Sequence, residues 1–271
     1  DKYVQIGRCF RDEDPRADRQ AEFTQLDLEM SFVDEEDVMS TCEGMVRRIW
    51  KQVLDVDVPP IRRMPYAEAM GTYGSDRPDL RYGLELIDVT DIAGETEFKV
   101  FLNAIKDGGI VKAIRVPGGG SRPRSYTDGL ADWIKQFGAG GLPVTKVDGG
   151  KLSTGIAKFL EPVKDALIER TGAEDGDLLC FGVHSRPQIV HRSLGELRCR
   201  LAADLGLIEP GKWEWLWVVD FPLVEWNEDE KRWDSLHHPF TAPAAEELEN
   251  IESNPGEVRS RAYDLVLNGS E

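Results

Sequence analysis

The stretch RCFRDEDPRADRQAEFTQLDLEMSF, residues 8–32, places a long charged loop between two segments that alternate like β-strands. Before the loop, Val4, Ile6 and Phe10 fall on one face of an extended segment. After the loop, every second residue from Leu26 to Phe32 is apolar and the residues between them are polar. The alternation predicts two strands, each with one face in the core and one polar face.

The polar face of the second strand carries Gln25, Asp27 and Glu29. Such a face can simply lie in solvent, as it does in many antiparallel sheets. The loop that precedes it, DEDPRADRQ, is too long for a tight hairpin turn, and long charged loops more often carry function than short ones. Solvent exposure and a functional surface therefore both remain open at this point.

A helix is predicted directly after the second strand. Asp34 can cap it, and Glu35, Glu36 and Asp37 lie favourably near its positive end. An apolar stripe at helical spacing predicts core packing; its members are Val38, Cys42, Met45, Val46, Ile49, Trp50 and Val53.

The composition narrows the class of protein. The 271 residues are 41% hydrophobic and carry 33 Lys plus Arg against 50 Asp plus Glu, a formal net charge of -17. Such a chain can bury a full core, and its charge repels polyanions at long range. Non-specific nucleic-acid binding by the whole surface is therefore not expected, although a local basic site is compatible with this charge.

Cysteine spacing and hydropathy bear on the cellular compartment. Cys9, Cys42, Cys180 and Cys199 are widely spaced and form no CxxC motif, so we expect neither a zinc site nor a disulfide framework, but small buried side chains. No apolar run approaches the roughly 20 residues of a membrane span, and the first residues do not resemble a signal peptide. A cytoplasmic protein that does not enter a membrane is expected.

The middle of the chain predicts a compact α+β module. Residues 60–82 are dense in Pro, Gly and charge, which favours a boundary, and a second boundary falls near LIEPGKW. Long strands are predicted again in EWLWVVDFPLVEW and RSRAYDLVLNG. Between the boundaries, short strands alternate with helices predicted over 127–137, 157–170 and 193–205.

Two glycine-rich stretches raise the question of a phosphate loop. VPGGGSRP lacks the third glycine of GxGxxG, and VDGGKLSTG lacks the residues that a P-loop needs. We therefore predict turns at both. No ligand-like cluster occurs in this part of the sequence, so we expect a separately folded module that does no chemistry itself.

The last residues predict a turn and a metal site. Asn268 and Gly269 favour a type I′ hairpin, which would put Asp264 diagonally opposite Glu271 on one sheet face. Diagonal positions are roughly 7 to 8 Å apart, close enough for two carboxylates to hold a hard cation. Because the returning strand is cut after two residues, we expect the chain to be a fragment.

Six motifs in order resemble class II aminoacyl-tRNA synthetases, in the form of the bacterial aspartyl enzymes. They are FRDEDPRADRQAEFTQLDLEMSF, YGSDRPDLR, RVPGGGS, WLWVVDFPL, HHPFTAP and AYDLVLNG, and together they cover essentially the whole sequence. The resemblance implies an α+β fold, in which an antiparallel catalytic sheet with flanking helices is interrupted by an α+β insertion. It implies a first catalytic part at 1–81, the insertion at 82–208 and a second catalytic part at 209–271, with motif 1, the motif 3 arginine and the anticodon-binding barrel outside this sequence.

The resemblance also implies an activity: an aspartate carboxylate attacks the α-phosphorus of ATP, and the aspartyl group then passes to the 3′ end of tRNA(Asp), with tRNA(Asn) left open. It assigns ATP contacts to Arg11, Asp12, Glu13, Gln20, Phe23 and Glu271. It assigns aspartate contacts to Arg11, Gln25, Asp27, His237 and His238, and Mg²⁺ binding to Asp264 and Glu271. Arg11 is the expected catalytic residue, because a guanidinium grips phosphate oxygens with two parallel hydrogen bonds.

Two alternative hypotheses for the function remain open. A non-catalytic tRNA-binding or synthetase-like paralogue could keep the fold, and an amide-forming enzyme could use adenylate chemistry without tRNA but would lack the insertion. The resemblance further implies a homodimer for the full-length protein. We expect the 271 residues alone to be inactive.

Overall fold

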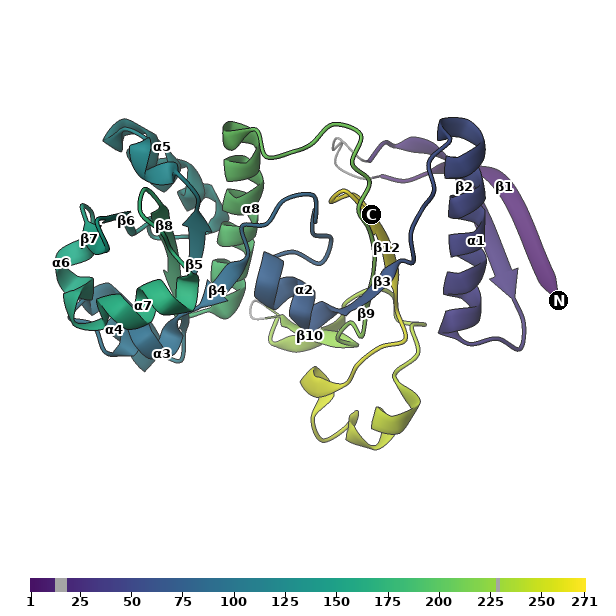
Figure 1. Cartoon of the computed structure of the whole chain (residues 1–271). Coiled ribbons are helices and arrows are strands. Elements are labelled where there is room, and N and C mark those ends of the chain that lie inside the picture. The colour runs from purple at the N-terminus through teal and green to yellow at the C-terminus, as the bar shows by residue number, and fades with distance from the viewer. Residues whose placement is uncertain (13–18, 228–229) are drawn as a thin grey trace. The chain divides into compact units, whose positions relative to one another are not determined.

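The computed structural model describes residues 1–12, 19–227 and 230–271 (Figure 1). Helices and strands are mixed along these residues, which confirms the predicted α+β class. The chain divides into two compact units. The first contains Asp1–Arg63, Pro222–Asp264 and Ser270; the second contains Met64–Phe221, Leu265–Gly269 and Glu271.

The first unit begins with the predicted pair of strands. β1 (Lys2–Phe10) pairs antiparallel with β2 (Glu22–Met30), in a continuous register from Lys2 opposite Met30 to Phe10 opposite Glu22. At the open end of the hairpin, the Ser31 N–H donates to the Asp1 carbonyl at 3.1 Å. At the loop end, Arg8 and Glu22 form an ion pair at 3.0 Å.

Helix α1 (Glu35–Leu54) has the predicted cap. The Asp37 N–H donates to the Asp34 side chain at 3.1 Å, and the Asp34 N–H donates to the Asp37 side chain at 3.2 Å. This reciprocal capping box satisfies two helix donors that would otherwise lack partners.

The predicted burial of this part of the chain is wrong in places. On the apolar face of the hairpin, Val4 is 59% exposed and Ile6 is 75% exposed. On α1, Met39 and Val46 are buried, but Val53 is 72% exposed. Alternation fixes which residues share a face, whereas burial requires another element to pack on that face. The other exposed members of the two predicted apolar faces are Phe10, Leu26, Phe32, Met45 and Ile49.

The rest of the first unit is a second hairpin and two 3-10 turns. Its elements are β10 (Val224–Asn227), β11 (Arg232–Ser235), η4 (Ala245–Asn250) and η5 (Pro255–Glu257). The long strand predicted over 214–226 is instead two strands, β9 (Trp215–Val219) and β10. Asp220 has a φ of 56° and is followed closely by Pro222, which lacks an N–H for the ladder.

The second unit is built on a five-stranded sheet of order β4-β5-β8-β6-β7, in which every described pair is antiparallel. These strands are β4 (Leu86–Asp88), β5 (Ile110–Val116), β8 (Leu178–His184), β6 (Val144–Asp148) and β7 (Lys151–Ser153). A second sheet has the order β12-β9-β3, with β12 (Asp264–Leu267) and β3 (Arg62–Pro65) on either side of β9. Its residues belong to the second unit except Arg62, Arg63 and Asp264, which belong to the first.

Helices cover both faces of the five-stranded sheet. Ile114 of β5 and Cys180 of β8 pack with Leu194 and other α8 residues, whereas Ala113 and Phe181 pack with Phe101 on the opposite face. Because both faces of the sheet are covered, the sequence of β8 is a nearly continuous apolar run. The helical elements of this unit are α2 (Tyr66–Tyr73), α3 (Thr90–Gly94), α4 (Lys99–Lys106), η1 (Gly119–Ser121), α5 (Arg124–Trp133), η2 (Ile134–Phe137), α6 (Ala157–Leu160), η3 (Glu161–Val163), α7 (Lys164–Thr171) and α8 (Pro187–Leu205).

Prolines explain where these helices differ from the prediction. The single helix expected over 157–170 is broken into α6, η3 and α7, because Pro162 lacks the N–H that would continue α6. The helix expected over 193–205 starts earlier, at Pro187, a residue favoured at the first helical position. The helix expected over 127–137 is α5 followed by η2.

The cysteines are unpaired thiols, as expected, but they are not all buried. Cys180 lies in the core, whereas Cys199 is exposed. Among the described residues, no helix combines the length and the hydropathy that crossing a bilayer requires.

The buried carboxylate of Asp177 organises the glycine-rich stretch that follows β5. It accepts hydrogen bonds from the Gly118 N–H at 3.0 Å and the Glu174 N–H at 2.9 Å, and Arg115 Nε donates to it at 2.6 Å. Burial alone would raise the pKa of Asp177, but the two backbone N–H groups and the Arg115 guanidinium together hold it below the ordinary value. The stretch is therefore a turn with a structural anchor, as predicted.

We predict that Asp177→Ala destabilises the second unit by about 3 kcal/mol, because it leaves a partly buried guanidinium and two N–H groups without their acceptor. Hydrogen exchange of the β8 amides measures this free energy of unfolding. As the folded-state pKa is lowered, the difference from wild type is fully present above about pH 5 and shrinks in more acidic solution.

Glu174→Ala is the matched control for this prediction. Glu174 pairs with the same Arg115 at 3.3 Å, but its side chain is 79% exposed. We expect its removal to cost less than about 1 kcal/mol. Equal effects of the two substitutions would show that Asp177 is not the anchor.

Candidate functional site

The β1–β2 register puts three predicted site residues on one face of the hairpin. Phe23 lies opposite Cys9 and Asp27 lies opposite Gln5, with Gln25 between them along β2. Side chains two residues apart in a strand share a face, so the aromatic ring, the amide and the carboxylate line up in that order. All three are half-buried.

Arg11 extends this face by one position beyond β1. Its backbone N–H donates to the Ala21 carbonyl at 2.9 Å, which continues the ladder past the Phe10–Glu22 pair. Its guanidinium lies over the Phe23 ring, 5.2 Å from the ring centroid, in cation–π geometry. A planar cation and an aromatic face are thereby held together at the end of the hairpin.

The remaining predicted residues of this region lie at the base of the loop. Asp12 and Gln20 are both exposed. Glu13 lies outside the described residues, so its predicted nucleotide contact stays a prediction.

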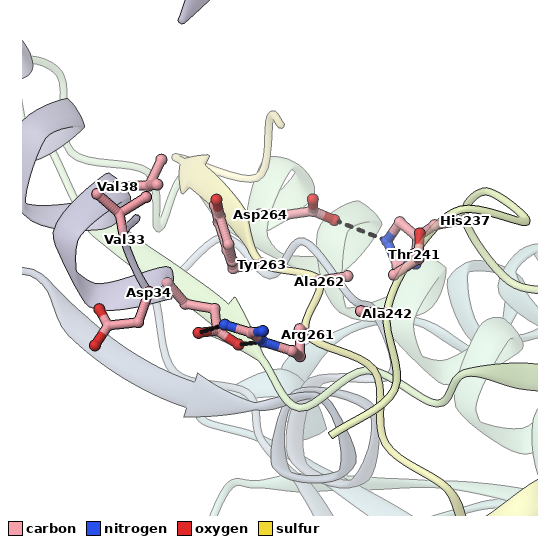
Figure 2. A pocket seen from close by; sticks show the side chains of 11 residues that line it. Val33, Asp34, Val38, His237, Thr241, Ala242, Arg261, Ala262, Tyr263 and Asp264 are labelled. Atoms are coloured by element: carbon pink, nitrogen blue, oxygen red, sulfur yellow. Dashed lines mark hydrogen bonds and ion pairs between the residues drawn. The ribbon is translucent and has the colours of Figure 1, made fainter. Parts of the chain in front are cut away.

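A pocket of about 460 Å³ in the first unit contains two further predicted residues. In Figure 2, a dashed line joins the neighbouring side chains of His237 and Asp264, with His237 Nε2 at 3.6 Å from an Asp264 carboxylate oxygen. The pocket is lined by the start of α1 and by residues near 237–242 and 261–264.

An ion pair that the sequence did not predict forms another wall of this pocket. Both Arg261 and Glu35 line it, and Arg261 Nη2 lies 2.6 Å from a Glu35 carboxylate oxygen (Figure 2). The Arg261 hydrogen bond lowers the pKa of Glu35, and burial raises the pKa of Tyr263 beside it. The sequence pattern predicts only favourable helix-end charges in the acidic first turn of α1, which also supplies the partner of Arg261.

Unlike His237, His238 is not among the residues that line this pocket. Its Nδ1 accepts a hydrogen bond from the Phe240 N–H at 3.1 Å, and its ring meets the Phe240 ring edge to face at 4.9 Å. These contacts tie His238 to its own loop, in keeping with the opposite directions of adjacent extended residues.

The predicted metal pair, Asp264 and Glu271, falls in different compact units, so its diagonal arrangement stays a prediction. The turn itself has the expected form, because Asn268 and Gly269 both have positive φ, at 53° and 83°. Among residues 1–12, 19–227 and 230–271, no three His, Cys, Asp or Glu side chains are grouped so that they could hold a metal ion. Two carboxylates nonetheless fit Mg²⁺, which usually takes one or two such ligands together with substrate phosphates.

Comparison with known proteins identifies the family. The family model for class II tRNA synthetases (D, K and N) matches residues 1–271. The chain is 52% identical to the aspartate–tRNA ligase of Halalkalibacterium halodurans, and 50% identical to the aspartate–tRNA(Asp/Asn) ligase of Halothermothrix orenii. Each match covers 100% of this chain and 46% of the relative, so the chain spans about half the length of these proteins. The chain belongs to the class II tRNA synthetases of the D, K and N group.

Proposed function

We propose that the full-length protein is an aspartate–tRNA ligase, which activates L-aspartate with ATP and transfers it to the 3′ end of tRNA(Asp). The observation that carries this proposal is the shared face of the β1–β2 hairpin, where Arg11, Phe23, Gln25 and Asp27 follow one another. The names of relatives about half identical to this chain over its whole length support the same activity.

In the first step, an aspartate carboxylate oxygen forms a bond to the α-phosphorus of ATP, and the bond to pyrophosphate breaks. Negative charge builds on the α-phosphate oxygens as this happens. Arg11 would bind them, because its guanidinium stays charged and can donate two parallel hydrogen bonds. The contact with Phe23 limits the conformations of Arg11 before the reaction, which lowers the entropy lost on binding phosphate.

The other residues of this face would hold the substrates. Phe23 offers its ring to adenine, while Asp27 pairs with the substrate ammonium group and Gln25 lies between them. His237 would contact aspartate from the pocket that it shares with Asp264. In the second step, a ribose hydroxyl of the tRNA takes the aspartyl group and AMP leaves.

Mg²⁺ bound with ATP would neutralise phosphate charge, and Asp264 and Glu271 are the side chains proposed to hold it. His237, 3.6 Å from Asp264, would restrict the orientation of that carboxylate. His238 is the weaker candidate for an aspartate contact, since its ring and Nδ1 are engaged with Phe240.

The choice of tRNA belongs to the proposal too. One relative is named for aspartate–tRNA ligation alone and another for tRNA(Asp/Asn), so tRNA(Asn) is a second candidate acceptor. We further propose a homodimer that works in the cytoplasm. A non-catalytic paralogue would need neither the aligned hairpin face nor the histidine–carboxylate pair, so those features favour the enzyme.

We predict that Arg11→Lys in the full-length protein slows aspartate-dependent ATP–pyrophosphate exchange by ~10² to 10³, equivalent to about 2.7 to 4 kcal/mol. Lysine keeps the charge but loses the two-pronged geometry. The control is Arg8→Lys, because Arg8 lies on the opposite face of the same segment and forms an exposed ion pair with Glu22. Exchange by Arg11→Lys within tenfold of wild type would remove Arg11 from its assigned role.

We also predict that Asp27→Asn lowers kcat/KM for aspartate by ~10 to 100-fold and leaves the KM for ATP nearly unchanged, because it removes a charged partner of the substrate ammonium group. Steady-state exchange at varied aspartate and varied ATP separates the two effects. Glu29→Gln, an exposed position further along the same face, is the matched control. A rise in the KM for ATP alone would assign Asp27 to the nucleotide instead.

A further inference from the structure

Arg198 is the largest fully buried side chain among the described residues, with 1% exposure. It lies on α8, inside the predicted insertion. Its guanidinium lies over the rings of both Tyr73 and Tyr82, at 4.8 and 4.4 Å from their centroids. A buried cation normally needs an anionic partner or a full set of acceptors, because leaving water is costly.

Backbone carbonyls supply those acceptors. Arg198 donates to the carbonyls of Asp79 at 2.5 Å, Tyr82 at 3.0 Å and Gly83 at 3.2 Å. One side chain thus fixes both ends of the segment 79–83, which is more than one hundred residues away in sequence.

Two lysines make similar contacts with backbone carbonyls, one before the segment and one within it. The nearly buried Lys112 of β5 donates to the Gly71 carbonyl at 2.7 Å, and Lys212 donates to the Arg81 carbonyl at 3.3 Å. The backbones also meet directly, since a Cβ added at Gly195 of α8 would lie 2.5 Å from the Gly74 carbonyl oxygen. Residues 71–83 are therefore held by cations and by close backbone packing from β5, α8 and Lys212, all of which follow them in sequence.

The segment 79–83 in turn supports the turn that precedes Glu271. A Cβ added at Gly269 would lie 3.1 Å from the Asp79 Cβ, so the two backbones are in close contact. The Asn268 side chain accepts from the Glu214 N–H at 2.9 Å and donates to the Lys212 carbonyl at 3.0 Å. The turn is therefore supported by Asp79, which precedes the predicted insertion, and by Lys212 and Glu214, which follow it.

We infer that Arg198 is a positioning residue for Glu271: it fixes the segment 79–83, against which the Asn268–Gly269 turn packs, and so sets where the Glu271 carboxylate can meet the metal-bound triphosphate. This inference rests on the proposed function for the role of Glu271. It gives the insertion a part in adenylate formation, although none of its residues is assigned a substrate contact.

The test compares Arg198→Lys and Arg198→Met in the full-length protein with Arg200→Met. Arg200 is on the same helix but pairs with Asp204 at 2.9 Å and leaves 79–83 untouched. In hydrogen-exchange mass spectrometry, we expect the peptide 263–271 of the Arg198 variants to exchange at least about tenfold faster, with β5 and β8 unchanged. We expect the Mg²⁺ concentration for half-maximal pyrophosphate exchange to rise at least about fivefold, while the KM for aspartate changes less than about twofold.

Unchanged exchange in 263–271 would overturn the inference, and so would faster exchange with an unchanged Mg²⁺ requirement. If Arg198→Met does not fold, Arg198→Lys and Lys212→Met decide the question, since each removes only part of the support. A wild-type protein without aspartate-dependent exchange would refute the proposed function instead, and the hydrogen-exchange comparison would still decide whether Arg198 supports the turn.

Discussion

The register of the β1–β2 hairpin is the constraint on which the candidate site depends. Strand side chains alternate between faces, so a slip of one residue would move Phe23 and Asp27 away from Arg11. The long loop cannot set this register as a tight turn would. Contacts at the two ends of the hairpin fix the register instead. Arg11 lies over the Phe23 ring at the loop end, and the Ser31 N–H bonds to the Asp1 carbonyl at the open end.

Periodicity and local polar chemistry predicted the elements of this hairpin and helix well. The alternation after Leu26 and the acidic residues from Asp34 lead directly to β2 and to the capping box of α1, because both depend on neighbours in sequence. The residues that share the apolar face of the hairpin were predicted correctly. The prediction that this face lies in the core was wrong, since Ile6 is 75% exposed. Burial depends on what packs against a face, and a strand pattern does not contain that information.

Long-range polar contacts could not be predicted from the sequence, for a related reason. Arg198 within a helix looks like a solvent-facing charge, and only the folded structure brings three backbone carbonyls and two tyrosine rings to it. Likewise, Arg261 and Glu35 are 226 residues apart and give no pattern in common. The resemblance to a family supplied the roles of His237 and Asp264, while the structure supplied the 3.6 Å separation between their side chains.

The central claim, activation of aspartate on this hairpin face, is tested most directly by the amino-acid dependence of ATP–pyrophosphate exchange. The full-length protein is assayed with L-aspartate, L-asparagine and L-lysine, the amino acids of its family group. The account predicts that kcat/KM for aspartate exceeds that for either of the others by at least ~10². A site built to pair with the side-chain carboxylate of aspartate leaves its own polar atoms unpaired when asparagine or lysine binds, because both lack that carboxylate. Preferential exchange with asparagine or lysine, or exchange that no amino acid stimulates, would contradict it.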